Sequence, residues 1–266
     1  MDNNTAYNLE YVHAVDAIDL ETRVKAMYHD VATQPEAKYH FEMGRKMAER
    51  LGYPSADLGR IPYNAIDSFA GVGYYFDMAD IKTGEAVVDL GSGSGMDTFI
   101  ASLKTGESGA VTGVDMTRAQ LQKSESLRKL HGINNVNYVE AYIDATTLDD
   151  EQFDVAISNG VINLSVDKPA VFREAARILK PGGRIALADI VTEKHLPDNI
   201  TCDATLWAAC IGGAAQEDDY ADAIRAAGFK IQVIRENDDY WFISDGARWA
   251  TDTFGVKSIS LLAVKE

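Results

Sequence analysis

Short apolar runs alternate with amphipathic segments along most of this chain. The runs predict strands over residues 86–90, 111–115, 136–141, 153–158, 184–190, 229–235 and 258–264. The segments between them place apolar residues at helical spacing and predict helices over residues 95–104, 117–131, 168–179 and 217–227. Lys180-Pro181-Gly182-Gly183 predicts a stop and a turn before the fifth strand. This alternation is typical of an α/β fold with a doubly wound parallel sheet.

The N-terminal part of the chain has a different pattern. Residues 1–17 are polar, and residues 20–51 have helical spacing that breaks at Pro35. Residues 53–83 contain two prolines and several glycines, which predicts a loop with short helix. The predicted units are an N-terminal helical cap with a loop segment, residues 1–83, and a sheet domain, residues 84–266.

Composition narrows the class of protein. A chain of 266 residues with 46% hydrophobic and 25% charged residues fits one globular domain with an appendage. The net charge of −16 repels phosphate backbones, so we expect no nucleic-acid partner. The N-terminus lacks the basic start and apolar core of a signal peptide, no apolar run is long enough for a membrane span, and the two cysteines form no disulfide framework. We therefore expect a cytoplasmic protein.

The most informative motif is the glycine-rich stretch EAVVDLGSGSGM, residues 85–96. A buried strand leads into Asp89, and Gly91, Gly93 and Gly95 follow at alternate positions. Glycine has no Cβ and tolerates positive φ, so such a turn lets the backbone approach a ligand closely. The spacing is G-x-G-x-G, which differs from the G-x-G-x-x-G of dinucleotide-binding folds.

An acidic residue follows about 20 residues later, the spacing at which a carboxylate meets a ribose. Asp115 ends the predicted second strand, and Met116 follows it. A carboxylate accepts two hydrogen bonds and can hold both ribose hydroxyls, while the methionine can pack on an adenine face. The alternative is that Asp115 caps the next helix, a common role of aspartate at such a junction.

The turn resembles motif I of the class I S-adenosylmethionine-dependent methyltransferases. The resemblance implies a Rossmann-like, seven-stranded sheet whose last two strands are antiparallel, with S-adenosylmethionine as cofactor. It places Asp89 near the amino-acid end of the cofactor and the glycines beside the sulfonium. It also implies that Asp144 and the backbone amide of Ile143 bind adenine, although Asp144 fits an ordinary loop aspartate as well.

The end of the fourth strand is a second candidate region, because open α/β sheets place ligands at strand carboxyl ends. We expect Ser158 and Asn159 to lie at the cofactor there. Asn163 is polar in an otherwise apolar run, and such a group needs a partner when buried. That partner is either a ligand or a backbone group of the turn.

Three further segments, SNGVINLSVDK, VFREAARILKPGG and LWAACIGGA, resemble the arsenite S-adenosylmethionine methyltransferases. The resemblance covers residues 67–228, and it implies three cysteine thiolates that hold trivalent arsenic, since soft thiolates suit soft ions. The first two cysteine positions hold Val72 and Gly160 here, and only Cys210 matches. Cys202 is nearby in sequence and could supply a second thiolate.

The acceptor pocket is therefore expected to be roomier and more apolar than an arsenic site. Tyr75, Asn163, Trp207 and Cys210 are its candidate lining residues, although the aromatic residues and the cysteine equally suit a buried core. The five histidines have no ligand-like spacing, so we expect no metal. No general base is evident, and no catalytic residue is assigned.

Three hypotheses follow. The first is methyl transfer to a small organic molecule at sulfur, nitrogen or carbon. The second is methylation of arsenite or another metalloid held by Cys202 and Cys210. The third is a cofactor-binding regulatory module without catalysis.

Overall fold

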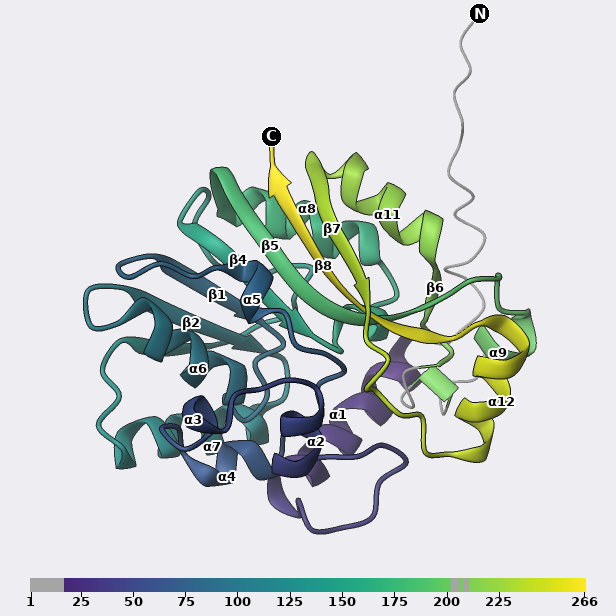
Figure 1. Cartoon of the computed structure of the whole chain (residues 1–266), viewed down its shortest axis with the longest axis horizontal. Helices are drawn as coiled ribbons and strands as arrows, with labels where there is room; N and C mark the ends of the chain where they lie inside the picture. The colour runs from purple at the N-terminus through teal and green to yellow at the C-terminus, as the bar shows by residue number, and fades with distance from the viewer. Residues whose placement is uncertain (1–16, 202–205, 208–210) are drawn as a thin grey trace, which may run out of the picture.

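The computed structural model describes residues 17–201, 206–207 and 211–266, and its centre is a single twisted sheet (Figure 1). The strands are β1 (Ala86–Leu90), β2 (Ala110–Asp115), β3 (Val136–Glu140), β4 (Phe153–Asn159), β5 (Leu179–Thr192), β6 (Ala215–Gln216), β7 (Phe229–Glu236) and β8 (Lys257–Lys265). Seven of them follow the order β3-β2-β1-β4-β5-β8-β7, and the two-residue β6 pairs with β5. β8 runs antiparallel to both of its neighbours, and the remaining pairs are parallel. The predicted fold class and the antiparallel final pair are confirmed.

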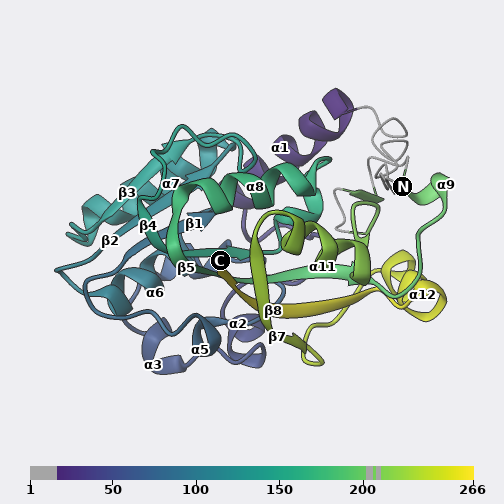
Figure 2. The ribbon, with the colours of Figure 1, turned by 90° about the horizontal axis from the view of Figure 1, so that it is seen from above.

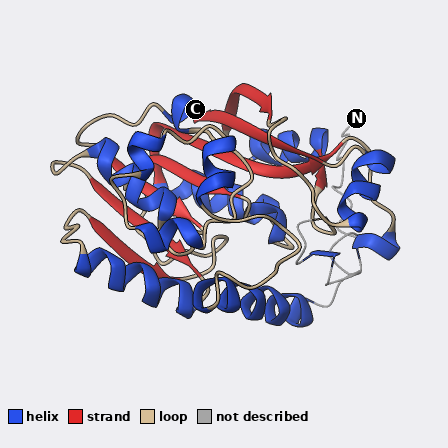
Figure 3. Ribbon diagram, turned by 60° about the horizontal axis from the view of Figure 1, so that its bottom comes forward, coloured by secondary structure: helices blue, strands red, loops and turns tan. Residues whose placement is uncertain are grey.

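Helices cover both faces of this sheet. They are α1 (Ala17–Thr33), α2 (Arg45–Arg50), α3 (Ser55–Leu58), α4 (Tyr63–Asp67), α5 (Phe76–Ala79), α6 (Met96–Thr105), α7 (Arg118–Leu130), the 3-10 turn η2 (Ile162–Leu164), α8 (Lys168–Ile178), α9 (Asp198–Thr201), α11 (Glu217–Ala226) and α12 (Asp245–Phe254). Figure 2 shows α8 and α11 on one face, and α6 with the short helices α2, α3 and α5 on the other. Figure 3 shows helices on both sides of most of the strands, while strands at one edge of the sheet are less covered.

Two hydrophobic cores hold the layers together. On one face, Phe172 of α8 meets Tyr220 of α11 edge to face, with ring centroids 5.2 Å apart. On the other, Phe99 of α6 packs with residues of the N-terminal helices, including Leu20 and Met47. The N-terminal segment therefore shares its core with the sheet, and the division at residue 83 stays a prediction.

The second N-terminal helix is shorter than the sequence pattern predicts. Residues 34–44 are not helical, and α2 begins only at Arg45 after Gly44, which has a φ of 83°. The apolar residues of this segment contact one another instead, because the Tyr39 and Phe41 rings stack with centroids 5.6 Å apart. Tertiary packing thus overrides the helical pattern of this segment.

The turn predicted before the fifth strand is an irregularity within it. β5 already begins at Leu179, which pairs with Phe153, and the pairing resumes at Arg184 opposite Val155. Gly182 lies between them with a φ of 74°, which suits glycine. The predicted stop is confirmed, because α8 ends at Ile178, but the predicted turn before the strand was wrong: the Pro-Gly-Gly sequence instead interrupts the ladder within β5.

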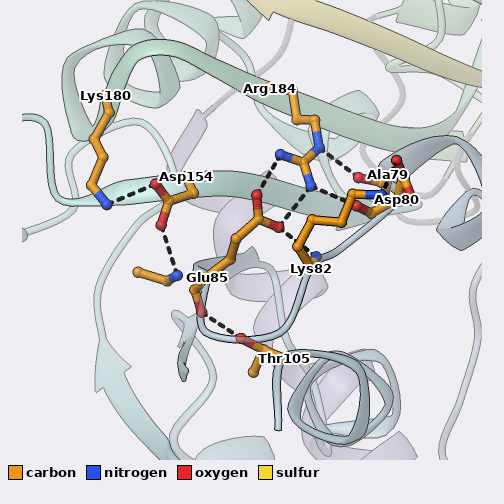
Figure 4. Close-up of polar contacts among 9 residues, drawn as sticks. Ala79, Asp80, Lys82, Glu85, Thr105, Asp154, Lys180 and Arg184 are labelled. Carbon is orange, nitrogen blue, oxygen red and sulfur yellow. Dashed lines mark hydrogen bonds and ion pairs between the residues drawn. The ribbon is translucent and has the colours of Figure 1, made fainter. Parts of the chain in front are cut away.

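Charged side chains join the strand starts at the edge opposite the glycine-rich turn (Figure 4). The two terminal guanidinium nitrogens of Arg184 donate to Glu85, at 2.9 and 2.7 Å. Lys180 donates to Asp154 at 2.7 Å, and Asp154 accepts the Ala86 amide at 2.9 Å. These contacts link β1, β4 and β5 at the amino edge and leave the carboxyl edge open for a ligand.

Candidate active site

A cavity of about 250 Å³ lies where the carboxyl ends of β1, β2, β3 and β4 meet. Its walls come from the turn after β1, from the residues after β2 and β3, from Asn159 at the end of β4, and from α1. Of the ten residues predicted at the cofactor, eight line it, namely Asp89, Gly91, Gly93, Asp115, Met116, Ile143, Asp144 and Asn159. Parallel strands bring these distant segments to one edge, which is why they share a cavity.

The glycine-rich turn is tightly packed on its outer side. Gly91 has a φ of 80°, and a Cβ there would overlap the Val161 side chain. Gly95 has a φ of 93°, and its Cβ would lie 2.5 Å from the Tyr138 hydroxyl. A Cβ at Gly93 would meet nothing closer than the Gln120 side chain at 3.9 Å, and both Gly91 and Gly93 line the cavity. Gly95 therefore lies at the start of α6, away from the cavity wall. Its lack of a side chain leaves room for Tyr138.

Asp89 is 2% exposed and stands at the base of the cavity. The Thr98 hydroxyl donates to its carboxylate at 2.6 Å. Burial raises the pKa of Asp89 well above its usual range, and the neighbouring Asp97 carboxylate raises it further. The site therefore places two neighbouring buried carboxyl groups, Asp89 and Asp97, behind the glycine turn.

Asp115 makes the helix-start contact that the sequence offered as one alternative, and the ribose contact stays a prediction. Its Oδ1 accepts the Thr117 amide at 2.7 Å, a contact at the start of α7, and its Oδ2 accepts the Gly93 amide at 2.9 Å. The side chain also lines the cavity beside Met116. Burial raises the pKa of this carboxyl group. Asp115 fixes the glycine turn while its carboxylate faces the ligand space.

The structure adds Asp97, which the sequence reasoning missed. This carboxylate of α6 is 5% exposed, lines the cavity and accepts hydrogen bonds from Tyr53 at 2.8 Å, Tyr75 at 2.7 Å and the Asn159 amide at 3.0 Å. Burial raises its pKa, while the three donors act in the opposite direction. The signal in the sequence was an acidic residue in the buried first turn of a helix, directly after the glycine motif.

Several predicted residues lie behind the cavity wall. The Ser158 hydroxyl donates to the Leu90 carbonyl at 2.8 Å, and Tyr75 is buried against Asp97. Trp207 donates to the Thr201 carbonyl at 2.6 Å. A Cβ at Gly213 would overlap both Trp207 and the Asn163 carbonyl, so these two residues pack around that glycine. Cys202 and Cys210 lie outside the described residues.

The first two cysteine positions of the arsenite methyltransferase pattern come together in space. Val72 is 1% exposed, and a Cβ at Gly160 would lie 3.1 Å from its Cγ1. The Val72 amide donates to Asn159 at 2.7 Å, and its carbonyl accepts Ser258 at 2.7 Å. Where the pattern has two thiols, this chain has a fixed valine against a glycine.

Helix α1 covers the cavity and is held at both ends. Lys25 donates to the Tyr142 hydroxyl at 2.9 Å, and that hydroxyl donates to Glu21 at 2.6 Å. Near the other end of the helix, Gln120 of α7 donates to the Tyr28 carbonyl at 2.9 Å. The N-terminal helix therefore limits access of water to the ligand space.

The cavity suits a cationic nucleoside ligand. The Ser92 hydroxyl is buried on its wall and has no hydrogen-bond partner among the described residues. No lysine, arginine or histidine is among the described residues that line it.

Within the described part of the chain, no group of three or more His, Cys, Asp and Glu side chains is arranged for a metal ion, and no helix is long and apolar enough to span a membrane.

Known proteins share these features. Residues 81–228 match a family model described as a methyltransferase domain. The arsenite methyltransferase of Halobacterium salinarum is 35% identical over 206 residues, 77% of this chain and 52% of that protein. The human arsenite methyltransferase is 38% identical over 152 residues, 54% of this chain and 40% of that protein. The chain thus matches about half or less of the length of these relatives.

Solved structures agree in fold. The arsenic(III) S-adenosylmethionine methyltransferase of Chlamydomonas reinhardtii superposes with a TM-score of 0.67 and 32% identity, over 79% of this chain and 72% of that one. Geranyl diphosphate C-methyltransferase of Streptomyces coelicolor gives a TM-score of 0.69 at 15% identity, over 95% of this chain and 100% of that one, which shows the fold alone.

The sheet order, the cavity and these matches together define the class: the chain belongs to the S-adenosylmethionine-dependent methyltransferases. Within that class its resemblance is to the arsenite methyltransferase family, as the motifs predict.

Proposed function

We propose that this protein transfers the methyl group of S-adenosylmethionine to a small organic acceptor. The choice of acceptor rests on one observation: Val72 lies against Gly160, and these residues occupy two of the three positions at which an arsenic site is expected to have a cysteine. Neither residue supplies a thiol. One remaining thiolate cannot form a trithiolate ligand set. The apolar residues that line the cavity, among them Leu20, Phe69 and Leu164, favour an organic acceptor.

When bound, the cofactor supplies an electrophilic methyl group on a positively charged sulfur. Asp115 and Ser92 would hold its polar groups, and the Met116 and Ile143 side chains would cover its base. Gly93 permits close approach of the backbone. Helix α1 excludes water, so that donor and acceptor are held together in a desolvated space.

Methylation of a metalloid held by Cys202 and Cys210 is the alternative. The named arsenite methyltransferases among the relatives favour it. Cys210→Ser separates the two proposals, because a two-thiolate site would lose its ligand while an organic pocket tolerates the change. We expect the variant to retain methyl transfer.

The test is label transfer from methyl-labelled S-adenosylmethionine by the purified full chain. One arm contains arsenite with added thiol, and the other contains a small-molecule extract. We expect label in an organic product and none in an arsenic species. Arsenic-dependent product that Cys210→Ser abolishes would establish the alternative, and absence of label from both arms would refute methyl transfer to either class.

Asp115→Ala serves as the loss-of-function variant in this assay. Its matched control is Asp222→Ala, because Asp222 is an exposed residue of α11 that pairs with Arg225 at 2.7 Å, on an element that does not line the cavity. If Asp115→Ala retains label transfer and Asp222→Ala loses it, the proposed site is contradicted.

A further inference from the structure

We propose that Asp97 is a specificity-determining residue that binds the α-ammonium group at the amino-acid end of the cofactor. The proposal rests on the proposed function, since it takes S-adenosylmethionine as the ligand. It concerns a carboxylate that the sequence motifs leave unassigned. Four observations carry it: the position of Asp97, its donors, the charge around it and its rigidity.

Asp97 has acceptor capacity left for a ligand. Oδ2 receives hydrogen bonds from Tyr53, Tyr75 and Asn159, whereas Oδ1 receives one, from Tyr53 at 2.8 Å. A carboxylate oxygen has two lone-pair sites, so Oδ1 can accept another donor. The residue lines the cavity, which places that donor in the ligand space.

All of the donors around Asp97 are neutral. They are two phenol hydroxyls and one carboxamide, and the described lining of the cavity contains no cationic side chain. Asp89 adds a second buried carboxylate behind the same turn. Buried charge is costly unless it is paired, so the two carboxyl groups ionise at lower cost when a cation lies beside them. A ligand ammonium group supplies that cation.

The position of Asp97 selects the amino-acid end of the ligand. Asp115, Met116 and Ile143 follow β2 and β3, whereas Asp97 is joined to Asn159 at the end of β4. Since β1 lies between β2 and β4, the two carboxylates Asp115 and Asp97 flank the glycine turn on opposite sides. A ligand whose ribose lies at Asp115 therefore extends its other end toward Asp97.

The neighbours of Asp97 are fixed, so its carboxylate is preorganised. Asn159 accepts the Val72 amide at 2.7 Å and donates to the Gly73 carbonyl at 3.0 Å, which fixes its orientation. The Tyr53 ring packs edge to face on Phe69, with centroids 5.2 Å apart. Residues held in this way support binding geometry at low entropic cost. Tyr53 and Asn159 are accordingly positioning residues.

A thermodynamic cycle between Asp97 and the ligand amine tests the proposal. Calorimetry on the full chain would compare S-adenosylhomocysteine with an analogue in which hydrogen replaces the α-amino group. We expect wild type to bind the analogue at least roughly tenfold more weakly, as for loss of a charge-assisted hydrogen bond. Asp97→Asn should bind the two ligands with affinities within about twofold, because the isosteric amide retains the contacts at Oδ2 but carries no charge.

5′-Methylthioadenosine, which lacks the amino-acid end, separates recognition from a structural role. Asp97→Asn should weaken S-adenosylmethionine and S-adenosylhomocysteine but leave this ligand within about twofold of wild type. Equal weakening of all three ligands would overturn the proposal, and so would an unchanged preference for the amine. If Asp97→Asn does not fold, the wild-type chain still tests the proposal. Equal affinity of wild type for the ligands with and without the α-amino group would refute it.

Failure of the inference remains distinguishable from failure of the proposed function. A wild-type chain that binds neither S-adenosylmethionine nor S-adenosylhomocysteine contradicts both. A chain that binds both but ignores the α-amino group contradicts the inference alone. Asp222→Asn, on α11, is the matched control and should leave all four affinities unchanged.

Discussion

At the scale of single residues, removing the buried hydroxyl of Ser92 should change cofactor affinity and stability in different ways. This hydroxyl lines the cavity and has no partner among the described residues, so Ser92→Ala removes a desolvated polar group without breaking a hydrogen bond. We expect stability to stay within about 0.5 kcal/mol of wild type or to rise. Cofactor affinity should fall roughly 3- to 10-fold, the value of one hydrogen bond. Chemical denaturation and calorimetry measure the two effects.

Ser102, on the helix that follows the glycine-rich turn, provides the control. Its hydroxyl donates to the Asn135 carboxamide at 2.6 Å and does not line the cavity. Ser102→Ala should lower the free energy of unfolding by about 1 kcal/mol and leave cofactor affinity unchanged. If the two serine variants behave alike, the hydroxyl of Ser92 has no role at the ligand.

Val72 and Gly160 test the choice of acceptor at the same scale. Val72→Cys combined with Gly160→Cys places two thiols at neighbouring positions, although the φ of 68° at Gly160 makes the second change costly by roughly 1 kcal/mol or more. We expect the double variant to bind arsenite at least about tenfold more tightly than wild type, because soft thiolates bind it. Either single variant is the control. Equal arsenite binding by wild type would show that the lost thiols are dispensable.

At the scale of elements, helix α1 depends on the Tyr142 contact. Tyr142→Phe removes the hydrogen bonds to Lys25 and Glu21 but keeps the ring on which the Lys25 ammonium lies, 4.8 Å from its centroid. These groups are partly exposed, so the contact contributes only about 0.5–1 kcal/mol. Hydrogen exchange in the first turns of α1 should rise roughly two- to fivefold, without change in α7. A uniform rise in both helices would indicate global destabilisation instead.

The stability of the amino-terminal ends of β1 and β5 should depend on Arg184 more strongly than that of α1 depends on Tyr142. The Arg184 side chain is 19% exposed and binds Glu85 through two nitrogens, and it also donates to the Asp80 carbonyl at 2.9 Å. Burial raises the pKa of Glu85, but the hydrogen bonds from Arg184 and the Lys82 amide, together with the Arg184 charge, outweigh burial, so the pKa is lowered. Arg184→Met should therefore cost about 2–3 kcal/mol of unfolding free energy at neutral pH.

The pH dependence checks the cause. A lowered carboxyl pKa stabilises the fold above the unfolded value near 4.5 and loses that contribution as pH falls through the folded value. The cost of Arg184→Met should thus shrink on acidification below about pH 4.5. A cost that stays constant to lower pH would mean that the packing of the arginine, and not its ion pair, stabilises the edge.

Elements with strong periodicity were predictable, and short ones set by tertiary contacts were not. Strands β1 to β4 and helices α6, α7, α8 and α11 lie within a few residues of their predicted positions because their apolar residues recur regularly. β5 begins at Leu179, before its predicted start at residue 184, and the short α9 and β6 were not predicted. Helix α12 was missed, since Gly246 weakens its start although Ser244 caps it with a 3.2 Å hydrogen bond from the Ala247 amide. The contacts of Asp97 were hidden for another reason: its donors come from residues 53, 75 and 159, and no local pattern connects them.

At the scale of the whole molecule, the buried carboxylates couple cofactor binding to pH. Burial raises the pKa values of Asp89, Asp97 and Asp115 in the cavity. A raised carboxyl pKa means that the folded state holds protons more tightly than the unfolded state does. Stability of the free protein is therefore reduced as pH rises from the unfolded pKa through the folded values.

A cationic ligand reverses this trend, because it favours the ionised carboxylates. The increase in melting temperature caused by saturating S-adenosylmethionine should therefore be larger at about pH 7 than at about pH 5, by several degrees. Asp189, whose pKa burial raises to about 6, titrates in the same range, but it does not line the cavity, so its contribution cancels between free and bound protein. Thermal unfolding with and without the cofactor at fixed ionic strength measures the difference. A cofactor effect independent of pH would mean that these carboxylates do not respond to the positive charge of the ligand.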